Sequence, residues 1–282
     1  MVCNRDERRD RAAALPPTAR RLRGQRAIYP MDPVGGGTWV GVNDAGLAAA
    51  VLNRTLDSKR MTGMRPSCSR GLIVPALLGH DTLDGALEAA ARLAPADFDL
   101  FRLVVVHATA IGILTSDGHS FSIATVPLVR PLMLTSSSLG DDAVRPARQA
   151  LFERIVTRGR RGWLNGQMRF HAHQWRTHPD ISVRMERADA RTVSRTVVDV
   201  RSGAIDMRYQ PVAEVVSRAA RRGESWPAKR RAETRRLHPT EKRSRVFSVS
   251  LSLGGQLLYA SQAVSTLTTA CYHPVSPLVR TA

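Results

Sequence analysis

Two short segments near the start of the chain constrain its fold most strongly. Residues 3–7 read Cys-Asn-Arg-Asp-Glu, and residues 35–43 read Gly-Gly-Gly-Thr-Trp-Val-Gly-Val-Asn. The second segment continues through the turn-forming residues Asn-Asp-Ala-Gly at 43–46 into a second apolar run that ends at Asn53. A glycine at the end of such a turn can adopt the positive φ that reverses the chain. The pattern therefore predicts a β-hairpin formed by residues 38–42 and 47–53.

Strand-like and helical patterns alternate along the rest of the first 211 residues. Ser69 and Thr82 are candidate N-caps for two helices, and Asp142 is a candidate N-cap for a third, with Pro146 in its first turn. Residues 8–34 are rich in Arg, Ala and Pro and are expected to form an irregular loop. Strands are predicted at 100–108, 110–115, 120–126, 191–200 and 205–209. Hairpins on both sides of a helical region favour an α+β fold with stacked antiparallel sheets covered by helices.

The charge is concentrated in two parts of the chain. The formal net charge is +18, from 42 Lys and Arg against 24 Asp and Glu. Residues 216–245 contain 11 basic residues against 3 Glu, and residues 1–26 contain 8 Arg against 3 acids. A basic cluster of this kind attracts anionic partners such as nucleic acid or a membrane face, although a solvated tail has the same composition. We therefore divide the chain into a folded domain, 1–211, and a basic, partly disordered extension, 212–282, with a strand-like alternation at 247–253.

No leader peptide and no convincing membrane span can be recognised. Residues 246–279 lack charged side chains, but about half of residues 246–270 are Ser, Thr, Gln or Gly, and such a helix inserts poorly. Cys3, Cys68 and Cys271 are far apart, which gives no CxxC metal site and favours a reducing compartment. We expect a cytoplasmic protein without a transmembrane segment.

The ordered motifs resemble the NRDE family, also called the Transport and Golgi organisation protein 2 family. The resemblance rests on Asn-Arg-Asp-Glu at 4–7, Gly-Gly-Thr-Trp-x-Gly-x-Asn at 36–43 and Leu-x-Asn at the strand end, and it extends weakly to about residue 210. It implies the fold of N-terminal nucleophile hydrolases, a four-layer αββα sandwich. It also implies cleavage of non-peptide C–N amide bonds by a terminal cysteine whose own α-amine accepts the proton.

The resemblance implies roles for three residues of a catalytic site. Arg5 would lower the pKa of the nucleophile, Asp6 would orient the α-amine, and Asn53 would stabilise the oxyanion. The nucleophile itself is absent, because family members begin Met-Cys one strand earlier, whereas Cys3 follows Met1-Val2. The first strand of the family is thus expected to be missing from this chain, and activity of the polypeptide as written is uncertain. Without the resemblance, Arg5 and Asp6 would be read as a surface ion-pair cluster.

Further candidates concern ligands. Trp39 and Asn43 in the hairpin are candidate substrate-binding residues, although Trp39 is more typical of a core position or a pocket wall than of a platform for a ligand. His171 and His173 form an H-x-H pair that would share one face of a strand, but no acid or cysteine is near in sequence, so no metal site is assigned. No cofactor is predicted. The family resemblance leaves haem possible as a ligand. The alternative to an amidohydrolase is therefore a non-catalytic carrier of haem or another small apolar molecule, with a possible anionic partner bound by residues 216–245.

Overall fold

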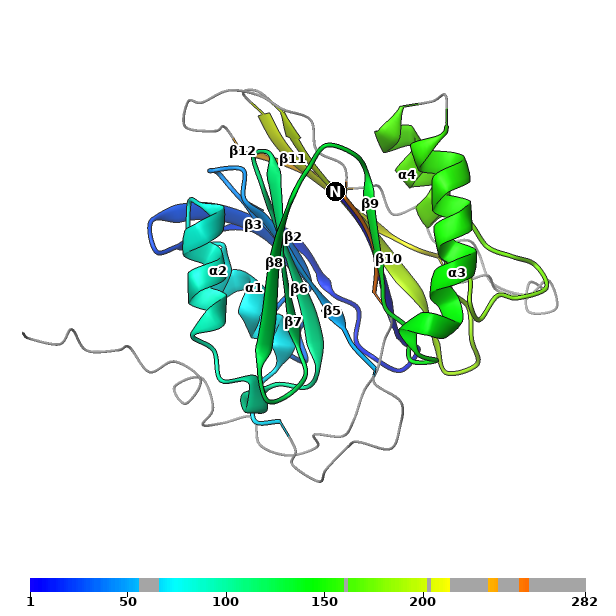
Figure 1. The fold of residues 1–282 in the computed structure, drawn as a ribbon, viewed down its shortest axis with the longest axis horizontal. Helices are drawn as coiled ribbons and strands as arrows, with labels where there is room; N and C mark the ends of the chain where they lie inside the picture. The colour runs from blue at the N-terminus through cyan, green and yellow to red at the C-terminus, as the bar shows by residue number, and fades with distance from the viewer. Residues whose placement is uncertain (56–65, 160–161, 202–203, 214–232, 238–248, 254–282) are drawn as a thin grey trace, which may run out of the picture.

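Two β-sheets form the centre of the computed structural model (Figure 1), which describes residues 1–55, 66–159, 162–201, 204–213, 233–237 and 249–253. The basic cluster predicted at 216–245 lies outside the described residues except for 233–237, and so does most of the uncharged stretch at 246–279. The β1 sheet has the strand order β12-β11-β10-β1-β13-β9, and the β5 sheet has the order β2-β3-β4-β5-β6-β7-β8.

The bounds of the strands follow from the backbone pairing. The β1 sheet contains β1 (Val2–Arg8), β9 (Leu132–Thr135), β10 (Ala190–Arg201), β11 (Ala204–Pro211), β12 (Glu233–Leu237) and β13 (Val249–Leu253). The β5 sheet contains β2 (Leu15–Leu22), β3 (Gln25–Met31), β4 (Val40–Asn43), β5 (Ala48–Asn53), β6 (Phe101–His107), β7 (Ala110–Ser116) and β8 (Phe121–Pro127). Neighbouring strands of the β5 sheet are antiparallel, whereas β13 runs parallel to both β1 and β9.

Helices cover the outer face of each sheet, as Figure 1 shows. The helices α1 (Ile73–Leu77) and α2 (Leu83–Ala91), with the short turns η1 (Arg70–Leu72) and η2 (Pro95–Asp97), accompany the β5 sheet. The helices α3 (Asp141–Phe152) and α4 (Trp163–His171), joined through the π-helical turn η3 (Glu153–Thr157), pack on β9 and β1. The predicted four-layer α+β sandwich is confirmed.

Most of the predicted elements are present. The hairpin is formed by β4 and β5, and the side chains of Ser69 and Thr82 cap η1 and α2 by accepting hydrogen bonds from Gly71 N and Gly85 N. The predicted cap of α3 is wrong, because the helix begins at Asp141 and Asp142 lies inside its first turn. The predicted strand near 247–253 is present as β13, between β1 and β9.

Residues 8–34 contain a hairpin, so the predicted irregular loop is wrong. Strands β2 and β3 are joined by Arg23 and Gly24, which both have positive φ, as a two-residue hairpin turn requires. The sequence interpretation took the prolines as a sign of irregular structure. Pro16 and Pro17 lie at the start of β2, an edge strand, and the pairing with β3 is irregular between Leu15 and Thr18, so a missing N–H is tolerated there.

The glycine run at 35–37 brings two loops into close contact. A Cβ atom on Gly37 would lie 2.3 Å from the backbone carbonyl of Gly71, so only glycine allows this approach. Thr38 N donates a hydrogen bond to Gly71 O at 2.9 Å across the same contact. The run therefore fixes η1 against the start of β4.

Apolar side chains fill both interfaces of the β1 sheet. One cluster lies between the two sheets and beneath α1 and α2, and a second, smaller cluster lies beneath α3 and α4. Residues Val2 to Asp6 of β1 are buried as a consequence of these two layers. None of the helices in the described residues is long and apolar enough to cross a bilayer.

Candidate functional site

The strand β1 places Arg5 and Asp6 on opposite faces of its sheet. Adjacent side chains of a strand alternate, so one points between the sheets and the next points towards the helices. We call these the inter-sheet face and the helix face. Arg5 lies over the Trp39 ring at 4.4 Å, and Trp39 lies at the start of a β5-sheet strand. Asp6 instead accepts a hydrogen bond from Thr192 Oγ1 at 2.5 Å on the helix face. The prediction that both line one pocket is therefore wrong.

Arg5 belongs to a closed ion-pair cluster on the inter-sheet face, which we call the Arg5 network. Arg5 Nη2 lies 3.2 Å from a Glu7 carboxylate oxygen and 3.5 Å from Asp32 Oδ2. Arg11 contacts the same two acids, at 3.4 and 2.5 Å.

These contacts balance the charges of the Arg5 network. Burial alone would raise the pKa of Asp32, but the hydrogen bond from Arg11 and the charges of Arg5 and Arg11 hold it below its ordinary value. Two guanidinium groups and two carboxylates balance one another in charge, although Arg11 Nε has no hydrogen-bond acceptor among the described residues, so the Arg5 network has the character of a scaffold.

Asp6 holds a different position, in the buried layer beneath α3. Burial raises the pKa of its carboxyl group to about 6, opposed by the charge of Arg148, the Thr192 hydrogen bond and the charge of Arg187. Arg148 extends from α3 and is itself 1% exposed. Burial lowers the pKa of Arg148 to about 10, opposed by the charge of Asp6. The pair therefore acts as a buried electrostatic support for the helix face.

The two predicted asparagines lie away from this pair. Asn53 ends β5, opposite Phe101 in the register, and within the described residues no hydrogen bond or ion pair joins it to Arg5 or Asp6. Asn43 is fully buried, and its Nδ2 donates to Leu78 O at 3.0 Å and to His80 O at 2.6 Å. Its Oδ1 accepts from Leu47 N at 3.0 Å. The Asn43 amide is thus engaged in holding the hairpin turn to the segment after α1.

The first residues of β1 carry no activated thiol. Cys3 is 1% exposed, and burial together with the charge of Asp6 raises the pKa of its thiol above the ordinary value. The Met1 amine is also buried and donates to Val198 O at 2.6 Å, and burial lowers its pKa to about 5. A nucleophilic cysteine requires the opposite shift, towards the thiolate.

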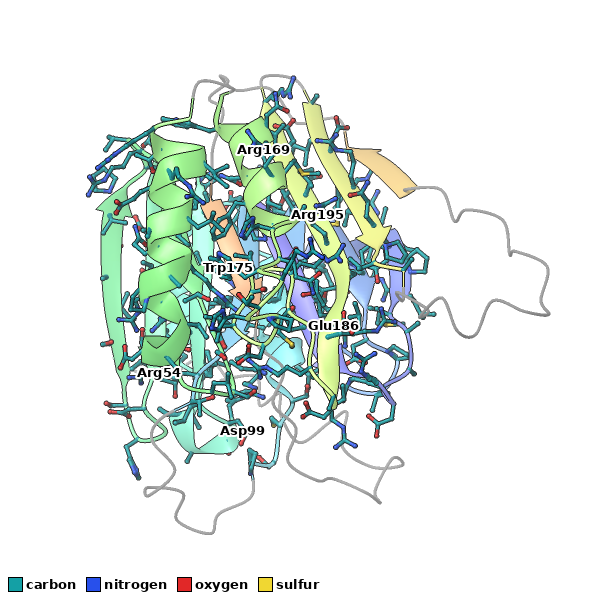
Figure 2. The ribbon with its side chains drawn as sticks, turned by 90° about the vertical axis from the view of Figure 1, so that its right-hand side faces the viewer. Arg54, Asp99, Arg169, Trp175, Glu186 and Arg195 are labelled. Atoms are coloured by element: carbon teal, nitrogen blue, oxygen red, sulfur yellow. The ribbon has the colours of Figure 1, made fainter. Side chains whose placement is uncertain are left out.

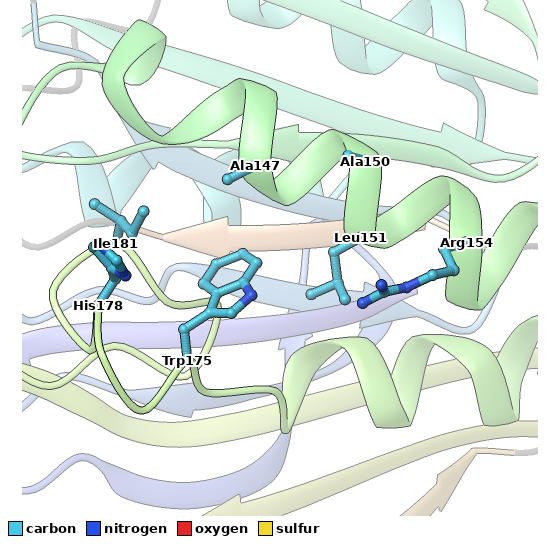
Figure 3. A pocket seen from close by; sticks show the side chains of 7 residues that line it. All are labelled: Ala147, Ala150, Leu151, Arg154, Trp175, His178 and Ile181. Carbon is cyan, nitrogen blue, oxygen red and sulfur yellow. The ribbon is translucent and has the colours of Figure 1, made fainter.

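The helix face contains a cavity that the sequence did not reveal (Figures 2 and 3). This Trp175 pocket has a volume of about 370 Å³, within the range of small-molecule sites, and lies between α3 and the loop after α4. Figure 3 shows Leu151 and Arg154 pointing from the helix towards the loop. Its described lining consists of Ala147, Ala150, Leu151, Arg154, Trp175, His178 and Ile181.

Hydrogen bonds fix the loop wall of the Trp175 pocket. Arg148 Nε donates to Ile181 O at 3.0 Å, and Arg148 Nη2 donates to Ser182 O at 2.8 Å. Ser182 Oγ accepts from Trp175 N and donates to His178 O, both at 2.8 Å. The buried Asp6 and Arg148 pair therefore supports this wall, which gives Asp6 a positioning role that the sequence did not predict.

The pocket combines an apolar wall with two polar groups. The Trp175 ring meets the His173 ring edge to face at 4.9 Å, which restrains its orientation. Arg154 lies in the π-helical turn η3, an irregularity that is frequent at functional sites. His178 Nδ1 lies 2.9 Å from Thr177 Oγ1, which leaves Nε2 as its second ring nitrogen.

His171 and His173 do not form the H-x-H strand pair considered from sequence. His171 is the last residue of helix α4 and is buried against Phe170, so it does not share a strand face with His173. Among the described residues, no group of three or more His, Cys, Asp and Glu is arranged to hold a metal ion.

A comparison with protein-family models identifies the ancestry of the segment that contains β1 and the glycine hairpin. Residues 1–159 match the model described as Transport and Golgi organisation 2, which is more than half of the 282-residue chain. No curated protein matches the sequence. The matched segment includes all of α3 and η3 and so contains one wall of the Trp175 pocket. The chain belongs to the Transport and Golgi organisation 2 family.

Proposed function

We propose that this protein is a non-catalytic carrier that holds a small apolar molecule with an acidic group in the Trp175 pocket. The observation that carries the proposal is the composition of the pocket, in which aliphatic groups and an indole ring form the walls and Arg154 stands at one end. An apolar body would be desolvated against Leu151 and Trp175, and an anionic group would be neutralised by the guanidinium.

Haem belongs to this class of ligand, because it combines an apolar ring with carboxylates. His178 is the residue that would hold its iron, since the Thr177 hydroxyl fixes one ring nitrogen and the other is the ligating atom. The iron would supply a characteristic absorbance. A linear or aromatic carboxylate would use the same walls and the same arginine without His178.

Amide hydrolysis, the activity implied by the resemblance, receives less support from the geometry. The Cys3 thiol is buried and has a raised pKa, the opposite of what a cysteine nucleophile requires. Arg5 and Asp6 also lie on different faces of the sheet. These positions favour binding over catalysis by a terminal nucleophile.

The test is a titration of the full chain with two fluorescent probes that differ only in an acidic group, anilinonaphthalene sulfonate and neutral phenylnaphthylamine. We expect both to bind, and Trp175→Ala to weaken both by about tenfold through loss of the aromatic wall. The matched control is Trp163→Ala, because Trp163 is 40% exposed on α4 and outside the pocket. Equal effects of the two tryptophan variants would contradict the proposal.

Arg154→Gln distinguishes the contribution of the arginine charge to probe affinity from that of the apolar walls. It should weaken the sulfonate by about tenfold and leave the neutral probe unchanged, because only the sulfonate gains a charge-assisted hydrogen bond. The control is Arg158→Gln, one turn further on and outside the described lining.

For haem, a titration followed by absorbance should show a shift that His178→Ala abolishes. A shift that survives this change would assign the axial ligand elsewhere.

A further inference from the structure

A second cavity opens on the helix face beside the end of α4. This arginine pocket has a volume of about 320 Å³ and shares no described lining residue with the Trp175 pocket. Arg195 comes from β10, Gln210 from β11 and Arg184 from the segment before β10. Figure 2 shows Arg195 on this face near Arg169 of α4, with Trp175 on the neighbouring part of the same layer.

Within the described residues, the two arginines of the pocket hydrogen-bond to neutral partners. Arg184 Nη2 donates to Gln174 Oε1 at 2.9 Å. Arg195 Nη2 donates to Gln210 Oε1 at 2.7 Å, and its Nη1 makes a weak contact with Met168 O at 3.4 Å.

The positive charge of the pocket is not compensated within the described part of the chain. Neither Arg184 nor Arg195 forms an ion pair there, and the described lining contains no carboxylate. The two charges also act on each other, because burial and then the charge of Arg184 lower the pKa of Arg195. A bound anion would relieve this repulsion.

The buried polar atoms of the lining residues include two, on Arg195 and Asn4, that lack hydrogen-bond partners among the described residues. One is the Nε–H of Arg195, which needs an acceptor, and the other is Oδ1 of Asn4, which needs a donor. The orientation of the Asn4 amide is fixed, since its Nδ2 faces two carbonyl oxygens, those of His171 and Val183, at 2.9 Å each. The pocket therefore suits a ligand with an anionic group, which would accept hydrogen bonds from the arginines, and with a hydrogen-bond donor for Asn4 Oδ1.

We propose that the arginine pocket binds a small phosphate monoester that also carries a hydroxyl group. Two guanidinium groups, which include the Nε–H of Arg195, supply several donor directions, and these suit the three outer oxygens of a phosphate better than the two of a carboxylate. The hydroxyl group donates to Asn4 Oδ1. The inference goes beyond the proposed carrier function, because its residues and its ligand class are separate from those of the Trp175 pocket.

The first test is calorimetric titration of the full chain with glycerol 3-phosphate at constant ionic strength. We expect saturable binding that weakens by about tenfold or more in Arg195→Gln and in Arg184→Gln, the loss typical of a charge-assisted hydrogen bond. Arg169→Gln is the matched control, because it removes the same charge from the exposed surface of α4 without touching the pocket. Thermal unfolding of each variant confirms that it is folded, and Arg184→Gln covers the case in which loss of Arg195 disturbs β10.

The second test separates the phosphate from the hydroxyl. Propyl phosphate has the same charge as glycerol 3-phosphate and lacks its hydroxyl groups, so it should bind about fivefold more weakly if Asn4 Oδ1 accepts a hydrogen bond from the ligand. Glycerol alone should not bind.

Three outcomes would overturn the proposal. One is the absence of binding by glycerol 3-phosphate at millimolar concentration, and another is equal weakening by Arg169→Gln and Arg195→Gln, which would mean attraction by net charge alone. Equal affinities for propyl phosphate and glycerol 3-phosphate would remove the assigned role of Asn4 and with it the hydroxyl-bearing ligand class.

Discussion

The two faces of the β1 sheet hold their arginines in opposite ways. On the inter-sheet face, Arg5 and Arg11 share Glu7 and Asp32, so each cation has carboxylate partners. On the helix face, Arg184 and Arg195 contact neutral amides and lie beside a cavity. The charges of the first arrangement are balanced by its own carboxylates, whereas within the described residues the charges of the second are not. The comparison teaches that a motif rich in charge can belong to the scaffold while binding capacity lies on the other face of the same strand.

Asp6 and Arg148, on the helix face, support the loop wall of the Trp175 pocket. Arg148 holds the carbonyl groups of Ile181 and Ser182, which shape the loop wall, and Asp6 balances its charge in the interior. The helix face therefore combines two buried, oppositely charged side chains with two cavities, and the inter-sheet face combines an ion-pair cluster with an apolar core.

Arg148→Met should give the largest effect on stability. The change leaves the Asp6 charge and two loop carbonyls without their partner, so we expect the free energy of unfolding to fall by about 3–5 kcal/mol. Chemical denaturation measures it. Arg145→Met is the control, since Arg145 lies on the same helix in an exposed ion pair with Asp142 and should cost about 0.5 kcal/mol or less. A loss below about 1 kcal/mol for Arg148→Met would show that this support is not needed.

Asp6→Asn should change the pH dependence of stability. The pKa of Asp6 is raised from 3.8 to about 6 on folding, so its favourable contribution is complete below about pH 4 and disappears as the pH rises through 6. The wild type should therefore lose on the order of 2–3 kcal/mol relative to the variant between pH 4 and pH 7. Denaturation curves across this range test the prediction, and parallel pH profiles of the two proteins would refute it.

Arg5→Lys tests whether the Arg5 network is a scaffold. Lysine keeps the charge but cannot contact two carboxylates and a Trp39 face in one planar geometry, so we expect a loss of about 1–2 kcal/mol. Probe binding in the Trp175 pocket should remain unchanged. If probe binding falls together with stability, the two faces of the β1 sheet are coupled, and the Arg5 network is more than a scaffold.

Glu88→Gln should give the smallest change in the free energy of unfolding. Glu88 and Arg92 form an ion pair on α2 with side chains 67% and 70% exposed, far from both faces of the β1 sheet. We expect a change in unfolding free energy within about 0.5 kcal/mol, because water screens such pairs. A loss as large as that of Arg5→Lys would mean that burial does not distinguish the ion pairs of this protein.

Local patterns in the sequence were sufficient for much of the architecture. The Asn-Asp-Ala-Gly turn predicted the β4 and β5 hairpin, and Thr82 marked the start of α2, because turn and cap chemistry depends on neighbouring residues alone. Prolines concealed the hairpin of β2 and β3, since their effect depends on whether the strand lies at an edge. The signal that could have revealed it is the Arg-Gly pair at 23–24, with strand-like residues on both sides.

The site was less predictable than the fold. Alternation along a strand already implies that Arg5 and Asp6 face apart once β1 is accepted as a strand, so this error could have been avoided from sequence. The bulge that shifts the β1 and β10 register between Arg5 and Asp6, pairing Asp6 with Thr192, could not be foreseen. The arginine pocket likewise joins residues of β1, β10 and β11, which no local pattern connects.

The sequence by itself determined the family, the α+β class and many of the strands, since hydrophobic periodicity, caps and turn residues act over a few positions. Tertiary structure decided which charges are neutralised and which remain available to a ligand. That distinction depends on burial and on partners more than a hundred residues apart, such as Asp6 and Thr192, and desolvation is a property of the packed molecule.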